Sequence, residues 1–135
     1  MKRYIYILCS LAALMTATTA FSQQIVDGTG EVKNLTIAGA MRGIFMGSAN
    51  GDVYIDNVIF DNVIYTFNSD GGNKNYGVYI SNCTINGWTS HSDVHKEVVY
   101  TNCSFGKGNG YAFCRPYGPT VYQNCEFSTD MEFDT

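Results

Sequence analysis

Basic residues are scarce in this 135-residue chain, because eight lysines and arginines stand against twelve aspartates and glutamates, giving a formal net charge of −4 at neutral pH. An acidic chain repels the phosphate backbone of DNA and RNA, so no nucleic-acid partner is expected. Long apolar runs are also missing. The apolar stretch at residues 4–15 is shorter than the roughly 20 residues that a transmembrane helix requires. The sequence therefore predicts no membrane span.

The sequence also lacks the apolar periodicity of helices. Instead, one short motif recurs five times. Each copy contains an asparagine between apolar residues, and consecutive asparagines are 20 to 25 residues apart. They are Asn34, Asn57, Asn82, Asn102 and Asn124. A repeat of this length without helices is typical of a solenoid of stacked β-strand coils. The sequence predicts an all-β, parallel, single-stranded β-helix of about five short coils.

The apolar positions of each motif define an inward face. Positions two before, one after and three after the asparagine are apolar in every copy, and in the second copy they are Ile55, Val58 and Phe60. The first two are three residues apart, whereas a straight strand alternates its faces every second residue, so the chain must bend at the asparagine. Asparagine tolerates left-handed backbone, and its amide can bond to the next coil. We therefore expect the five asparagines to form a structural ladder.

Three cysteines, Cys83, Cys103 and Cys125, directly follow motif asparagines. In a stack they would lie about 4.8 Å apart with parallel side chains. A disulfide instead needs Cβ atoms at about 3.8 Å and converging bonds. We expect these three cysteines to be free thiols in an internal ladder. Cys114 lies in another strand, and its state stays open.

Residues 1–22 have the features of a secretory signal peptide. Lys2 and Arg3 precede the apolar stretch, and small residues follow at positions 16–20. Cleavage after Ser22 fits the small-residue rule, with cleavage after Ala20 as the alternative. The removed segment carries two basic residues and no acid, so the remaining domain, residues 23–135, would have a net charge of −6. The chain is expected to be secreted, periplasmic or held at the cell surface.

The repeated x-Asn-Cys-x-Phe-like turn, seen at residues 101–105 and 123–127, resembles that of the right-handed parallel β-helix of the pectin-lyase-like superfamily. The resemblance covers about residues 32–127 and implies a right-handed solenoid. The superfamily includes pectate lyases, pectin methylesterases, polygalacturonases, phage tailspikes and adhesins. The resemblance therefore implies a fold and no single activity.

A catalytic constellation is not evident. Glycoside hydrolysis needs two carboxylates about 5 to 9 Å apart, and the aspartates of this chain do not recur at one position of the repeat. Those in or near the loops are Asp52, Asp61, Asp70 and Asp93. The segment at residues 115–117 is similar to the Arg-Pro-Trp segment of pectin methylesterases, but the Gln-Asp and Asp-Phe motifs of that family have no counterpart. We assign no catalytic residue, and a reduced polysaccharide lyase or pectin-esterase-like enzyme acting on acidic glycans is the alternative.

Two loops carry metal-ligand chemistry. Residues 68–73 supply oxygen ligands suited to calcium, but their spacing matches no established calcium loop. Residues 91–95 contain two histidines and an aspartate, without a third nitrogen or thiolate nearby. No metal or cofactor is predicted, although calcium stays open.

Aromatic side chains provide the remaining candidate site, because flat rings stack on sugar rings. We predict ligand binding by Trp88, His91, Arg115 and Tyr117, in a non-catalytic module that binds a polysaccharide or cell-surface glycan. A structural or adhesive solenoid, or a truncated fragment of a longer β-helix protein, is a further alternative. The fifth motif is followed by no evident cap, which leaves end-to-end self-association open.

Overall fold

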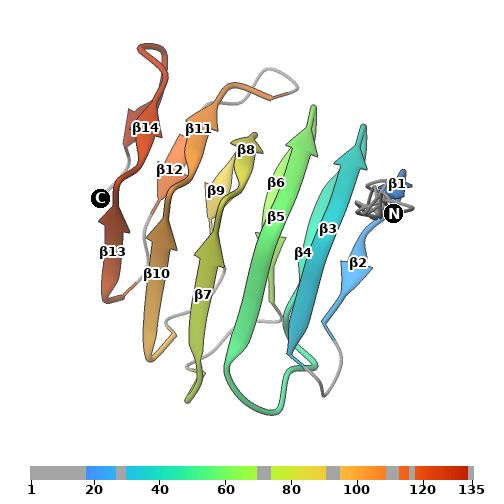
Figure 1. Ribbon diagram of the computed structural model, residues 1–135, viewed down its shortest axis with the longest axis vertical. Coiled ribbons are helices and arrows are strands. Elements are labelled where there is room, and N and C mark those ends of the chain that lie inside the picture. The colour runs from blue at the N-terminus through green and yellow to red at the C-terminus, as the bar shows by residue number, and fades with distance from the viewer. Residues whose placement is uncertain are drawn as a thin grey trace, which may run out of the picture.

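The computed structural model describes residues 18–26, 30–69, 74–90, 95–108, 113–115 and 118–133. Parallel β-strands stack as a solenoid of about four turns (Figure 1). This confirms the predicted all-β parallel fold, built from motifs that repeat along the chain. Within the described ranges there is no helix long and apolar enough to cross a membrane.

The largest sheet has nine strands and bends into two arms at one corner. Strands β3 and β5 are long enough to cross the corner, and β5 pairs with β7 on one arm and with β8 on the other. The strands of this sheet are β1 (Thr18–Ala20), β3 (Glu31–Ala38), β5 (Val53–Asp61), β7 (Gly77–Ser81), β8 (Thr84–Asn86), β10 (Glu97–Thr101), β11 (Ser104–Gly106), β13 (Thr120–Gln123) and β14 (Glu126–Phe127).

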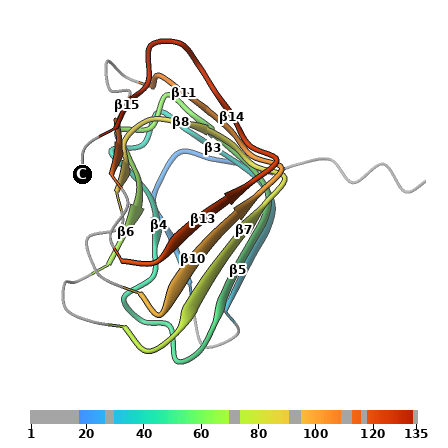
Figure 2. The ribbon, with the colours of Figure 1, turned by 90° about the vertical axis from the view of Figure 1, so that its left-hand side faces the viewer.

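Two three-stranded sheets form the side opposite the corner, as the view along the stack shows (Figure 2). A bridge between Tyr65 and Trp88 joins them. One sheet consists of β2 (Gln24–Ile25), β4 (Arg42–Phe45) and β6 (Tyr65–Asn68), and the other of β9 (Thr89–Ser90), β12 (Phe113–Arg115) and β15 (Glu132–Phe133).

The core lies between these sides and contains the apolar positions of the motifs. Ile55, Val58 and Phe60 are fully buried, as the alternation predicts. Equivalent residues of neighbouring coils stack in register. The rings of Tyr100 and Tyr122 lie 5.1 Å apart and nearly parallel. Such an aromatic pair contributes about 0.5–1.5 kcal/mol beyond its burial.

The backbone bends at the motif asparagines, all five of which adopt left-handed φ angles between 51° and 56°. Their amides also contact one another across coils. The Nδ2 of Asn57 donates to Asn34 Oδ1 at 2.9 Å, Asn102 donates to Asn82 at 3.3 Å, and Asn124 donates to Asn102 at 2.7 Å. The left-handed backbone at each corner is thus the conformation that the sequence predicts.

Cys83 and Cys103 are buried free thiols, and Cys125 is a half-buried free thiol. Their sulfurs donate to backbone carbonyls, as Cys83 does to Ser81 at 3.1 Å and Cys103 to Thr101 at 3.4 Å. The thiols therefore fill the inner side of the corner as small, weakly polar groups.

A further coil precedes the first motif. Strand β1 pairs with residues 35–37 of β3, and β2 pairs with Ile44 and Phe45 of β4. Strand β1 lies within the segment that the sequence predicts to be cleaved. It contains no motif asparagine, so the repeat pattern gives no sign of it.

Candidate functional site

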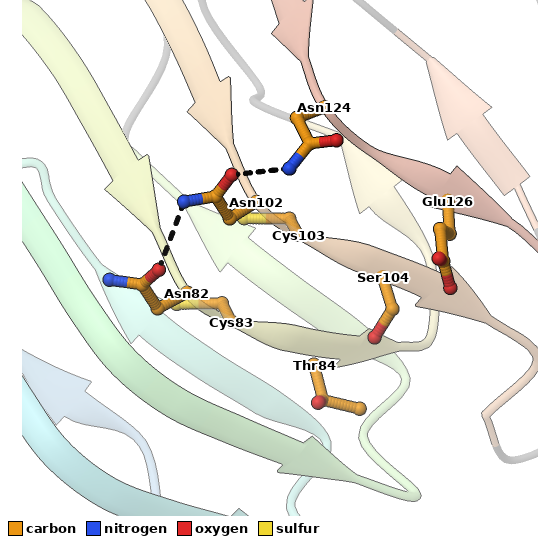
Figure 3. A pocket seen from close by; sticks show the side chains of 8 residues that line it. All are labelled: Asn82, Cys83, Thr84, Asn102, Cys103, Ser104, Asn124 and Glu126. Carbon is orange, nitrogen blue, oxygen red and sulfur yellow. Dashed lines mark hydrogen bonds between the residues drawn. The ribbon is translucent and has the colours of Figure 1, made fainter.

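A polar groove follows the corner of the large sheet over three successive coils (Figure 3). Its volume is about 380 Å³. The register of the strands positions its lining residues, because β11 pairs with both β8 and β14 and so aligns Ser104 with Thr84 and Glu126. The full lining is Asn82, Cys83, Thr84, Asn102, Cys103, Ser104, Asn124 and Glu126.

The asparagines of this groove are mostly occupied by their own ladder. Asn102 donates to Asn82 and accepts from Asn124, and the Nδ2 of Asn82 donates to Asp56 Oδ1 at 2.8 Å. The groups directed to solvent are the side chains of Thr84, Ser104 and Glu126, which are half-buried or exposed. The groove can therefore exchange hydrogen bonds with water or with a hydroxyl-rich ligand through one column of side chains.

Two of the thiols beside the groove are not activated nucleophiles. A hydrogen bond with Cys103, together with burial, raises the pKa of Cys83. Burial also raises the pKa of Cys125. Because the thiolate is the reactive form, the raised pKa values reduce the reactivity of these two cysteines near neutral pH.

An aromatic column lies on the opposite side of the solenoid, where the two small sheets meet. The ring centroids of Tyr65 and Trp88 are 5.3 Å apart with the planes tilted by 40°, and both side chains are half-buried. Arg42 is exposed and pairs in register with Tyr65. Gly43, beside it, faces inward, since a Cβ there would lie 2.8 Å from the Phe60 ring. The outward column therefore runs from Arg42 through Tyr65 to Trp88.

Two of the four predicted ligand-binding residues, Trp88 and Arg115, belong to this side of the molecule. Trp88 directly precedes β9, and Arg115 ends β12, where its backbone pairs with Ser90 of β9. Trp88 and Arg115 thus occupy adjacent coils, although the side chain of Arg115 is not described. His91 and Tyr117 lie outside the described residues.

Arg42 and Tyr65 were not predicted as ligand-binding residues. The sequence does contain a signal for them, because Arg42, Tyr65 and Trp88 are evenly spaced by 23 residues. That spacing equals one coil, so the three residues occupy one column of the stack. The signal for this column is therefore the repetition of large side chains at the length of one coil, and not the presence of single aromatic residues.

Metal-ligand groups do not converge in the described part of the chain. No set of three or more histidine, cysteine, aspartate or glutamate side chains there could hold a metal ion. His95 is buried and its ring contacts Tyr76 at 5.2 Å. Asp52 accepts a hydrogen bond from the Gly77 backbone at 2.8 Å, which is a structural contact between coils. Residues 70–73 and 91–94, which supply most of the predicted metal-ligand chemistry, lie outside the described ranges.

Comparison with protein-family models, with curated proteins and with solved structures finds no match for this chain.

Proposed function

We propose that this chain is an exported, non-catalytic member of the pectin-lyase-like superfamily that binds a glycan along the aromatic column of Arg42, Tyr65 and Trp88. The parallel solenoid and its asparagine corners support this family assignment, with the right-handed coil that the family implies. The N-terminal sequence pattern supports export to the cell surface, the periplasm or the medium.

The contact between Tyr65 and Trp88 is the observation that carries the proposal. Two aromatic rings meet on the outer face of the solenoid and keep part of their surface open to solvent. Aromatic rings bury large apolar areas, and tyrosine and tryptophan also carry a polar group. Their flat faces can therefore stack on the apolar faces of sugar rings. A ligand lying along the column would contact successive coils at intervals of about 4.8 Å.

Arg42 adds a cation to one end of this column. Its guanidinium can donate several hydrogen bonds, and it binds carboxylates in a bidentate geometry. A chain with net negative charge repels polyanions overall, so a local cation beside the aromatic rings would favour acidic sugars at this place. We therefore expect uronic-acid-containing glycans among the best ligands.

A glycan array with the exported form of the chain, with and without calcium, tests the proposal. Trp88→Ala should abolish glycan retention, and Arg42→Gln should reduce retention of acidic glycans selectively. Tyr54→Ala is the matched control, because Tyr54 and Tyr79 also stack on adjacent coils, at 5.2 Å, but on the large sheet. Thermal unfolding of each variant separates lost binding from lost folding.

The masses of the eluted glycans decide between binding and catalysis. Intact masses together with loss of retention in Trp88→Ala support the binding module. Cleaved or demethylated products would overturn its non-catalytic character and favour the enzyme. Equal retention by Trp88→Ala and the unmodified chain would place the ligand elsewhere and refute the site.

A further inference from the structure

The large sheet has an exposed strand edge at each end. At the C-terminal end, β13 pairs with β10 and β14 with β11, and no other described strand covers either of them. At the N-terminal end, β3 pairs with β5 along its length and with β1 over residues 35–37 alone. An uncovered strand edge presents unpaired backbone groups that can pair with another chain.

The asparagine ladder gives these ends a direction. Asn57 donates to Asn34, and Asn124 donates to Asn102, so each amide directs its Nδ2 toward the preceding coil. The Nδ2 of Asn34 makes no hydrogen bond within the described structure, and Asn124 Oδ1 accepts none there. Among the described residues, the ladder therefore has a free donor at Asn34 and a free acceptor at Asn124.

The inward-facing apolar columns also have incompletely buried residues at both ends of the stack. Val32 begins the column that ends in Tyr122, and Leu35 begins the one that ends in Cys125. All four side chains are half-buried, in contrast to the fully buried residues between them. A second copy placed one coil spacing away would complete the burial of both ends.

The side formed by the two three-stranded sheets carries opposite charges at its two ends. The strand registers place Glu132 of β15 in the same column as Arg42, four coils away. Both residues are exposed, and neither has an ion-pair partner among the described residues. Strand β2 pairs with Ile44 and Phe45 and leaves Arg42 unpaired on that edge. Strand β15 of a neighbouring copy could therefore pair beside Arg42, next to β2, without displacing β2.

We propose that chains cleaved after Ser22 stack head to tail, with the β13–β14 edge of one copy paired to the β3 edge of the next. Cleavage removes β1, which otherwise occupies the position that β14 of the neighbour would take. Asn34 Nδ2 then donates to Asn124 Oδ1 across the joint, and Arg42 faces Glu132. The contact joins two different surfaces, so it leaves a free end on every added copy and builds an open fibre rather than a closed dimer.

Sedimentation velocity and electron microscopy of the exported protein, with its N-terminus read by mass spectrometry, test this assembly. The expected result is a mass that rises continuously with concentration, and fibres whose axis is the coil axis. Glu132→Arg and Arg42→Glu should each suppress assembly, and the double variant should restore it. Asp61→Arg is the matched control, since Asp61 is exposed on an interior coil and the charge change is the same.

A second variant tests the ladder itself. Asn34→Asp keeps the acceptor for Asn57 and tolerates the left-handed backbone, but it removes the outward donor and places a charge opposite Asn124. It should weaken assembly with little change in melting temperature. Asn57→Asp should lower the melting temperature and leave assembly of the folded protein intact. A monomer at every concentration, a closed dimer, or assembly indifferent to both charge reversals would overturn the proposal.

Discussion

Asn82 donates its side-chain hydrogen bond to Asp56 Oδ1 at 2.8 Å, and so departs from the asparagine-to-asparagine pattern of the other coils. The hydroxyl of Ser81 donates to the same oxygen at 2.7 Å. The ladder is therefore two shorter runs, Asn34 to Asn57 and Asn82 to Asn124, joined by one carboxylate. That carboxylate ties the second coil to the third at the corner.

Replacing this carboxylate should cost stability. Asp56→Ala removes the acceptor of two hydrogen bonds, and because water can reach the exposed donor of Asn82, we expect a loss of about 1 kcal/mol in the free energy of unfolding. Urea unfolding followed by circular dichroism measures it. Asp61→Ala, at the exposed end of the same strand, is the control and should change the stability little. Equal effects of the two substitutions would contradict a special role for Asp56.

The same carboxylate should make stability depend on acid. Hydrogen bonds from Ser81 and Asn82 lower the pKa of Asp56 below its usual 3.8. A carboxyl whose pKa is lower in the folded state stabilises the fold above 3.8, and this contribution is lost as the pH falls through the folded-state pKa. Melting temperatures measured below pH 4 should therefore fall more steeply for the unmodified chain than for Asp56→Asn. Parallel curves would refute the assignment.

The stability of the fold at alkaline pH should depend on Tyr79. Its hydroxyl donates to Glu97 Oε1 at 2.6 Å, and this bond raises the pKa of Tyr79 to about 12, from 10.0. The unfolded chain would lose that proton first, so stability should decline as the pH rises from 10 toward 12. Tyrosinate absorbance should show one late-titrating phenol that Tyr79→Phe abolishes. Tyr54→Phe, which alters the ring stacked on Tyr79, should leave that late phenol in place.

Corner backbone conformation can be tested separately from corner hydrogen bonds. Asn102 has a φ of 54° and bonds to both Asn82 and Asn124. Asn102→Gly removes the bonds but permits the left-handed backbone, whereas Asn102→Ala also incurs the steric cost of the left-handed conformation. We expect alanine to be less stable than glycine by about 1 kcal/mol. A reversed order in thermal unfolding would mean that the corner tolerates any small residue.

Alkylation with iodoacetamide should distinguish the cysteines of the column. Cys125 is half-buried, whereas Cys83 and Cys103 are 2% exposed. A hydrogen bond with Cys83 lowers the pKa of Cys103 to about 7, but burial blocks access of the reagent, so Cys125 should react first. Cys83 should be slow, because its hydrogen bond with Cys103 and its burial raise its pKa and suppress the thiolate. Peptide mapping assigns the labels, and unfolding in urea should make all three reactive. Recovery of a disulfide between Cys83 and Cys103 would contradict the free-thiol column.

The repeat made most of the fold predictable. The asparagine period fixes how residues of successive coils align, and the apolar positions at Ile55, Val58 and Phe60 identify the inward face, which is the face that is buried in the folded chain. Turn chemistry accounts for the left-handed corners. These features depend on local backbone preference and on burial, both of which a single sequence records.

Features that break the repeat could not be predicted in the same way. Asn62 also has a positive φ, of 55°, yet it lies outside the motif. Asp56 captures the amide of Asn82 only because β5 and β7 align Asp56 with Ser81. The first coil, from β1 and β2, carries no motif and is positioned by pairing with β3 and β4. The Asp56 contact and the position of the first coil depend on contacts between coils rather than on their own sequence.

Stacking by whole coils also sets how this chain must fold. The ladder partners lie 20 to 26 residues apart along the chain, so no neighbouring pair of strands can form a tight hairpin. Each first contact requires the closure of a long loop before any pairing offsets the lost entropy. Chains dominated by such distant contacts fold slowly. The smallest nucleus is then two adjoining coils, and the speed of folding is governed by how quickly the intervening loops close rather than by the strand propensity of any one segment.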